Sequence, residues 1–191
     1  MPKQKRSRER RAQMVAHGLE LLKFRDLEEV AISEITGDLG FSTGSFYSGF
    51  SDKAAFFVAV QEMANAHMVA WIEADIETPA FQALAMADRL QVGIDLVLRY
   101  FAQFTGVLRS ALRYEHKLPA AWEPNRISAQ RVADGLSHGL SGGQKQRMQL
   151  AVQMAFGTMV NALLHDPGPL RLDDPKFGTQ LMTVLRPFLE D

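Results

Sequence analysis

The sequence contains no cysteine in its 191 residues. This absence excludes disulfide scaffolds, thiolate metal sites and cysteine nucleophiles, and it fits the reducing cytoplasm. Long apolar runs are also missing, so we expect neither the core of a signal peptide nor a helix that crosses a bilayer. Convincing strand-like alternation of apolar and polar residues is missing too. These absences predict a cytoplasmic protein with no membrane partner.

Neither sign of charge dominates, since 21 Lys and Arg residues oppose 22 Asp and Glu residues. A net charge of -1 excludes a chain that is basic throughout, like a ribosomal protein or a histone. The basic residues are nevertheless concentrated: residues 1–11 hold six of them and one acidic residue, a net charge of +5, which leaves −6 for the other 180 residues. This segment is either a solvated tail or an arm that contacts the phosphate backbone of a nucleic acid.

Apolar residues recur three and four positions apart along most of the chain, which predicts amphipathic helices. The 47% hydrophobic content is enough to give these helices a core. Helical stripes are predicted over 8–22, 30–39, 42–50, 53–76, 94–112, 143–164 and 177–188, with breaks at 78–79, 119–124, 137–143 and 166–175. We therefore expect an all-α fold, with an N-terminal three-helix domain at 1–55 and a larger C-terminal helical bundle at 56–191.

A tight Gly-Phe-Ser turn at 40–42 separates the second and third predicted helices. This arrangement is typical of a helix-turn-helix, whose last helix lies in the major groove of DNA. Ser42 is a good N-cap for that helix, and Ser51 is a good N-cap for the next one, where Asp52 suits the positive end. One side of the third helix is small or hydroxylic and suits close approach to DNA, while Phe46 and Phe50 hold the other side to the core.

Residues 35–53, ITGDLGFSTGSFYSGFSDK, resemble the DNA-binding signature of the TetR (tetracycline repressor) family of transcriptional regulators. The resemblance covers about residues 8–56. It implies that Thr43, Ser45 and Tyr47 contact the groove and the phosphates, and that Lys53 contacts a phosphate at the start of the fourth helix. Together with the basic segment and the polar side of the third helix, it gives the predicted DNA-binding residues: Arg8, Ser33, Ser42, Thr43, Gly44, Ser45, Tyr47, Ser48 and Lys53.

Four positions depart from the pattern of that family. Ala31 stands where a capping threonine is usual, Thr36 and Leu39 replace alanines, and Gly49 stands where histidine or tyrosine is common. The loss of two phosphate contacts would weaken DNA binding, and the cations of residues 1–11 would offset that loss. These departures leave an alternative open, a helical protein-interaction module with a vestigial helix-turn-helix.

Residues 140–147, LSGGQKQR, resemble the signature motif of ABC-transporter ATPases, in which a Ser-Gly-Gly turn binds the γ-phosphate of ATP. That chemistry needs a P-loop, and the sequence has no G-x-x-x-x-G-K-[ST] pattern and no Gly-Lys dipeptide. We therefore interpret Ser141 as the cap of the helix at 143–164. ATP binding through residues 140–147 is the third option.

The TetR resemblance implies that a small molecule bound in the C-terminal domain opposes DNA binding. It also implies a homodimer through the last two long helices, where small residues such as Ala151, Ala155 and Gly157 would let a second chain approach. The alternative is that the helix at 143–164 is simply central in its own bundle. An expected pocket for a largely apolar effector is lined by Met63, Met68, Trp71, Phe101, Phe104, Leu108, Leu112 and Trp122. Aromatic stripes of this kind are more often plain core.

The histidines His67, His116, His138 and His165 are scattered without the spacing of metal ligands. No catalytic constellation is evident, so we predict no metal, no cofactor and no enzymatic activity. Arg113, Glu115 and His116 are polar groups that either orient a ligand or are solvated. The sequence thus predicts a ligand-responsive DNA-binding regulator, expected to be a repressor, that binds a palindromic operator as a homodimer.

Overall fold

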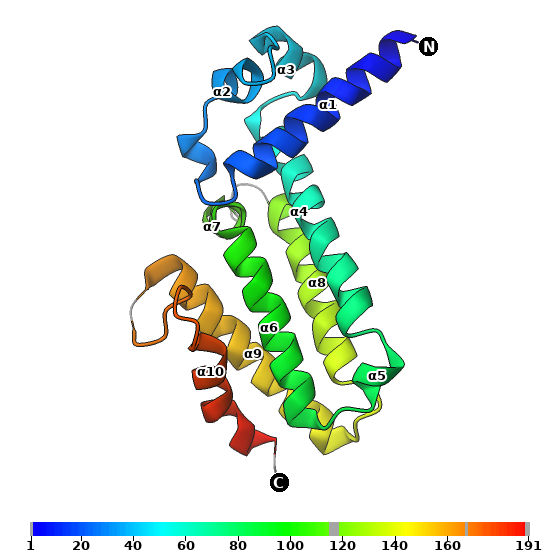
Figure 1. Cartoon of the computed structure of the whole chain (residues 1–191), viewed down its shortest axis with the longest axis vertical. Coiled ribbons are helices and arrows are strands. Elements are labelled where there is room, and N and C mark those ends of the chain that lie inside the picture. Colours follow the sequence, from blue (N-terminus) through cyan, green and yellow to red (C-terminus); the bar gives the residue numbers. More distant parts are fainter. Residues whose placement is uncertain (1, 115–118, 167, 190–191) are drawn as a thin grey trace. The chain divides into compact units, whose positions relative to one another are not determined.

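A computed structural model of the chain describes residues 2–114, 119–166 and 168–189, and it is all-α with no strand in these ranges (Figure 1). None of the helices in the described ranges combines the length and the apolar character needed to cross a membrane. The helices are α1 (Pro2–Leu21), η1 (Leu27–Glu29), α2 (Ile32–Gly37), α3 (Thr43–Gly49), α4 (Lys53–Asp75), α5 (Pro79–Gln82), α6 (Met86–Gln103), α7 (Thr105–Tyr114), α8 (Pro119–Leu136), α9 (Gly142–His165), α10 (Phe177–Leu185) and η2 (Arg186–Phe188).

The chain forms two compact units, and each is made of two segments. Unit 1 comprises Met1–His67 and Phe104–Asn125, and unit 2 comprises Met68–Gln103 and Arg126–Asp191. Unit 1 therefore contains more than the three-helix segment 1–55, and the assignment of separate roles to 1–55 and 56–191 stays a prediction.

The basic segment is helical, because α1 begins at Pro2 and runs without interruption to Leu21. Its contact with the phosphate backbone of a nucleic acid stays a prediction. Proline is tolerated at a first helical position, and the Lys, Arg, Gln and Glu residues that follow are good helix formers. Lys5 and Glu9 add an ion pair one turn apart, at 4.0 Å. The cations of the segment are therefore arranged with helical periodicity.

The long apolar stripe predicted over 94–112 belongs to two helices rather than one. The chain breaks at Phe104, between α6 and α7. The reason lies at Gly106, whose backbone N–H donates to the Lys23 carbonyl oxygen at 2.9 Å. A Cβ atom at this glycine would lie only 2.3 Å from the carbonyl oxygen of Arg25, so α7 starts in direct backbone contact with the segment that follows α1.

The predicted break at 119–124 lies inside α8, which starts at Pro119 and contains Pro124. A proline at the first position loses no helical hydrogen bond, and one near the start of a helix removes a single bond. The other predicted breaks are confirmed: Thr78 caps α5 by accepting from the Phe81 N–H at 3.2 Å, and turns separate α8 from α9 and α9 from α10.

Within unit 2, α6 packs against both α9 and α10 (Figure 1). Phe101 meets Phe156 edge to face, with ring centroids 6.0 Å apart. Ala151 and Ala155 are buried inside this unit, so the prediction that they let a second chain approach is wrong. Of the three small residues named for that role, Gly157 is the exposed one.

Candidate nucleic-acid interface

An aromatic cluster holds α3 in unit 1. Phe46 is fully buried, and its ring centroid lies 5.2 Å from that of Phe50 and 5.4 Å from that of Phe56. Gly18 of α1 makes room for this cluster, because a Cβ there would lie 2.2 Å from the Phe56 ring. Apolar burial therefore fixes one side of α3 to the core of unit 1.

The turn before α3 has the geometry of a helix-turn-helix. Gly40 adopts the left-handed conformation, with φ +68°, which a glycine adopts without strain. The Phe41 N–H then donates to the Thr36 carbonyl oxygen at 2.8 Å, and the Ser42 hydroxyl accepts from the Ser45 N–H at 3.3 Å. The predicted cap at Ser42 is confirmed, and it aligns the first turn of α3 with the end of α2.

The polar side of α3 is exposed. Tyr47 is 58% exposed, while its ring contacts Phe46 edge to face at a centroid distance of 5.5 Å. Ser45 is half-buried, and its oxygen lies 3.2 Å from that of Ser42. The other predicted α3 residues are also exposed: Ser42, Thr43, Gly44 and Ser48. The six predicted residues from 42 to 48 therefore share one short helix and its cap.

The next helix, α4, begins with a lysine four residues after the end of α3. Lys53 is half-buried, and its pKa is lowered. Burial lowers the pKa by more than the negative charge of Glu28 raises it. Asp52 caps α4, since its Oδ1 accepts from the Ala55 N–H at 2.7 Å. The predicted cap at Ser51 is wrong: the Ser51 hydroxyl donates to Asp52 at 3.3 Å instead. The negative charge of Asp52 suits the positive N-terminal end of α4, which is 23 residues long.

Two of the departures from the family pattern, Ala31 and Thr36, lie at α2. Ala31 precedes α2 and supplies no side-chain cap, as the sequence predicts. The Thr36 hydroxyl is buried but donates to the Ile32 carbonyl oxygen at 3.0 Å, so its burial leaves no unsatisfied donor. Ser33, the second residue of α2, is exposed, and so is Arg8 on α1.

Two arginines of the basic segment other than Arg8 lie beside α3. Arg6 and Arg10 line a small pocket in unit 1 together with Ser45, Ser48 and Gly49, and its volume is about 260 Å³. The Arg10 guanidinium lies 5.8 Å from the centre of the Phe41 ring. The spacing of Arg6 and Arg10, four positions apart, could have predicted that they lie on the same side of a helix, but only if the basic segment is assumed to be helical.

Three solved structures each match more than nine tenths of this chain. A TetR transcriptional regulator from Rhodococcus sp. RHA1 has a TM-score of 0.61 and 21% sequence identity, covering 97% of each chain. GusR of Salmonella enterica has a TM-score of 0.63 at 15% identity over 96% of each chain, and a transcriptional regulator from Cytophaga hutchinsonii has 0.64 at 15% identity over 92% of each. No protein-family model and no curated protein matches the sequence. The chain has the fold of the TetR transcriptional regulators.

In this TetR fold, the predicted effector residues are divided between the two units. Met68, Trp71 and Phe101 belong to unit 2, and the others, Met63, Phe104, Leu108, Leu112 and Trp122, belong to unit 1. Phe104 is buried beside His67, with ring centroids 5.4 Å apart. Trp71 lies under the Arg99 guanidinium, 4.0 Å from the ring centre. Their role in binding an effector stays a prediction, and Glu115 and His116 lie outside the described residues.

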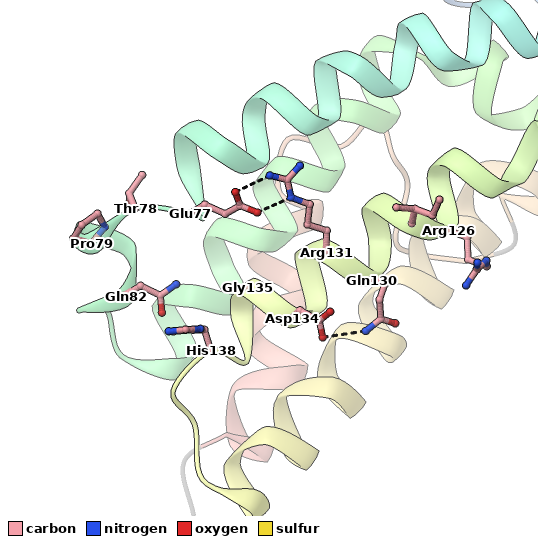
Figure 2. Close-up of a pocket in the computed structure, with 11 residues that line it drawn as sticks. Glu77, Thr78, Pro79, Gln82, Arg126, Gln130, Arg131, Asp134, Gly135 and His138 are labelled. Carbon is pink, nitrogen blue, oxygen red and sulfur yellow. Dashed lines mark hydrogen bonds and ion pairs between the residues drawn. The ribbon is translucent and has the colours of Figure 1, made fainter.

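A different pocket, of about 770 Å³, lies within unit 2 of the TetR fold (Figure 2). Its lining comes from the α4–α5 loop, α5, α8 and the turn after α8, and it includes none of the eight predicted effector residues. Arg131 donates to both carboxylate oxygens of Glu77, at 2.6 and 2.7 Å, and to Glu73 at 3.2 Å. This pairing raises the pKa of Arg131 and lowers that of Glu77. Gln130 donates to Asp134 at 3.0 Å, so several polar groups here are already satisfied within the unit.

The LSGGQ-like segment of this TetR fold starts α9. Gln144 reaches back so that its Oε1 accepts from the Ser141 N–H at 3.1 Å and from the Ser141 hydroxyl at 2.9 Å. This geometry is that of a helix start, as the sequence interpretation predicts. Within the described part of the chain, no three His, Asp or Glu side chains gather in a group that could hold a metal ion.

Proposed function

We propose that this protein is a DNA-binding transcriptional regulator of the cytoplasm, and that it is not an enzyme. The observation that carries the proposal is the exposed hydroxyl and tyrosine surface of α3, capped by Ser42 and held from behind by buried Phe46. Such a helix can approach base edges closely, because Gly44 and the small side chains beside it occupy little space. The similarity to solved transcriptional regulators supports the same reading.

The proposed contacts divide into two kinds. Thr43, Ser45 and Tyr47 contact the groove and its flanking phosphates, while Lys53 and Arg8 contact phosphates alone. Partial burial of Lys53 lowers its pKa, and a phosphate oxygen beside the ammonium would stabilise its charged form. Phosphate contacts supply affinity and salt dependence, whereas the α3 contacts supply the choice of sequence.

We propose a homodimer that binds a palindromic operator through two copies of α3. Support comes from the apolar residues that α9 and the C-terminal helices expose in unit 2: Leu150, Met154, Val184 and Phe188. A second copy of the same surface would bury them. We expect Leu150→Glu with Val184→Glu to give a monomer by light scattering. Ile127→Glu, which changes an exposed apolar residue of α8, should leave the dimer intact.

We further propose that a small, largely apolar effector releases the DNA and that the protein is a repressor. Trp71 and Trp122 are the two tryptophans of the chain, and both belong to the predicted effector residues. A compound library can therefore be screened by tryptophan fluorescence and then by release of labelled DNA. An effector must do both, because DNA and effector oppose each other's binding. Compounds that change the fluorescence but never release DNA would contradict this part of the proposal.

The test of DNA binding is a selection of duplexes from random sequence, followed by fluorescence anisotropy with the recovered DNA. We expect the wild-type protein to enrich a palindrome and Tyr47→Ala to lose at least tenfold in affinity for it. Phe24→Ala is the matched control, because Phe24 is an aromatic side chain that is 69% exposed and lies outside α3. Failure to enrich any sequence, with equal weak binding to all duplexes, would favour the interaction module instead.

A further inference from the structure

The pocket between α1 and α3 of unit 1 has a lining that suits an anion. Two arginines, Arg6 and Arg10, line it from α1, and two serines, Ser45 and Ser48, line it from α3. The Ser48 hydroxyl donates to the Ser45 carbonyl oxygen at 2.8 Å, a bond that an entering anionic oxygen could replace. Guanidinium and hydroxyl donors together are the usual surroundings of a phosphate group in proteins.

The two arginines are exposed and have no carboxylate partner among the described side chains, whereas their neighbour Lys5 is paired with Glu9. Arg10 is nevertheless positioned, because its guanidinium lies near the face of the Phe41 ring. Next to it, Arg11 lies 4.8 Å from the centre of the Phe50 ring. Two adjacent cations of α1 thus contact aromatic rings of the α3 region, and their charge is left for an external anion.

Gly49 keeps this pocket open. A Cβ atom at this position would lie 3.6 Å from the Met14 Cε and 3.8 Å from the Arg11 side chain, which are ordinary contacts. Packing therefore does not require a glycine, and its φ does not lie in the left-handed region. Since Gly49 lines the pocket, a long side chain at this position would add bulk to a lining that also contains Arg6 and Arg10.

We propose that this pocket binds one phosphate of the DNA backbone, with Arg6 and Arg10 as its cationic contacts. The inference rests on the proposed function and adds a defined contact to it. The helical conformation of residues 2–11 is essential, because it brings residues four positions apart to the same side of α1. The glycine that replaces a family phosphate contact thus creates a site for a different one.

The test is a double-mutant cycle between the protein and single phosphates of the selected duplex. Each phosphate near a half-site is replaced in turn by an uncharged methylphosphonate, and binding is measured to wild type, Arg10→Gln and Lys5→Gln. For Arg10→Gln we expect about a tenfold loss of affinity for unmodified DNA. At one particular phosphate, replacement by methylphosphonate should cause this variant no further loss of affinity. Lys5→Gln removes an equal charge from the same helix. Any loss of affinity that it causes should multiply with the loss caused by each methylphosphonate, because the two changes are independent.

Losses for Arg10→Gln that multiply at every phosphate would overturn the proposal while the protein still bound its operator, so the proposed function would survive. A wild-type protein that selects no duplex would overturn both. Titration with inorganic phosphate, followed by the amide resonances of Ser48 and Gly49, provides the remaining arm. Shifts that depend on Arg10, together with no coupling to any DNA phosphate, would mean a site for free phosphate instead.

Filling the pocket tests the same site without removing a charge. Gly49→Leu should weaken binding about as much as Arg10→Gln and abolish the coupling to the same phosphate. Gly49→Ala fits the ordinary contacts at this position and should retain both affinity and coupling. Equal behaviour of Gly49→Leu and wild type would overturn the proposal.

Discussion

The arginines at the start of α1 and the arginines of α6 and α8 in unit 2 differ in whether they pair with carboxylates. In unit 2, Arg99 pairs with Asp75 at 2.8 Å and Arg131 pairs with Glu77 and Glu73. In α1, Lys5 pairs with Glu9, but Arg6, Arg8, Arg10 and Arg11 are exposed, and none of these four arginines pairs with a carboxylate among the described residues. The net charge of the chain is close to zero, so acidic residues are available, but they are placed elsewhere.

Paired and unpaired arginines have different effects on stability and on the binding of anions. A paired arginine contributes to the geometry of its own unit and attracts an external anion weakly. An unpaired group of cations raises the local potential and attracts phosphate, at some cost in self-repulsion. Unit 1 contains both kinds, because Arg109 and Arg113 both donate to the buried carboxylate of Asp26.

The largest effect should follow from breaking the internal pairs. Asp26→Ala leaves two guanidiniums without their shared acceptor, and we expect a loss of about 3 kcal/mol in the free energy of unfolding. For a chain of this length the melting temperature would fall by roughly 10 °C. Arg6→Gln is the comparison, and its melting temperature should stay at that of wild type. Equal destabilisation by the two variants would break the distinction.

The next effect concerns recognition rather than stability. Lys53→Ala should weaken DNA binding by about tenfold and leave the melting temperature unchanged. Its ammonium forms no ion pair with a carboxylate among the described residues of unit 1, although the charge of Glu28 acts on it. Lys145→Ala, near the start of α9, removes the same charge from an exposed position in unit 2. Anisotropy with the selected duplex should detect no loss for this control.

A smaller gain should come from restoring a cap. Ala31→Thr places a hydroxyl before α2, where no side chain now accepts the free N–H groups. We expect a stabilisation of about 1 kcal/mol by thermal unfolding, and tighter DNA binding if the hydroxyl also meets a phosphate. Ala31→Val has the same shape without the oxygen, so a gain shared by both variants would argue against capping.

The smallest effect should be seen at the paired arginines of unit 2, through pH. The hydrogen bond from Arg131 lowers the pKa of Glu77, so the stability from this pair is complete above the ordinary carboxyl pKa and is lost as the pH falls through the lowered one. Arg131→Gln should lower the melting temperature by about 2 °C at neutral pH and by less at about pH 3. A difference that grew toward acid pH would contradict this sign.

Local signals predicted the helix-turn-helix well. The Gly40 turn, the Ser42 cap and the buried Phe46 all depend on neighbours close in sequence, and each is confirmed. The break between α6 and α7 was missed because its cause is a backbone contact of Gly106 with residues some eighty positions earlier. The sequence analysis assigned the cations of residues 1–11 to phosphate as a group. It did not place Arg6 and Arg10 beside α3, because a run of basic residues gives no sign that it is helical.

The most direct test of the account is a salt series with the selected duplex and a scrambled duplex of equal length. We expect sequence-dependent binding whose logarithmic dependence on salt has a slope steeper than about −4, because several phosphates are neutralised. The double variant Arg6→Gln with Arg10→Gln should make this slope shallower by about 2. Binding that is equal for both duplexes, or a slope that this double variant leaves unchanged, would contradict the account.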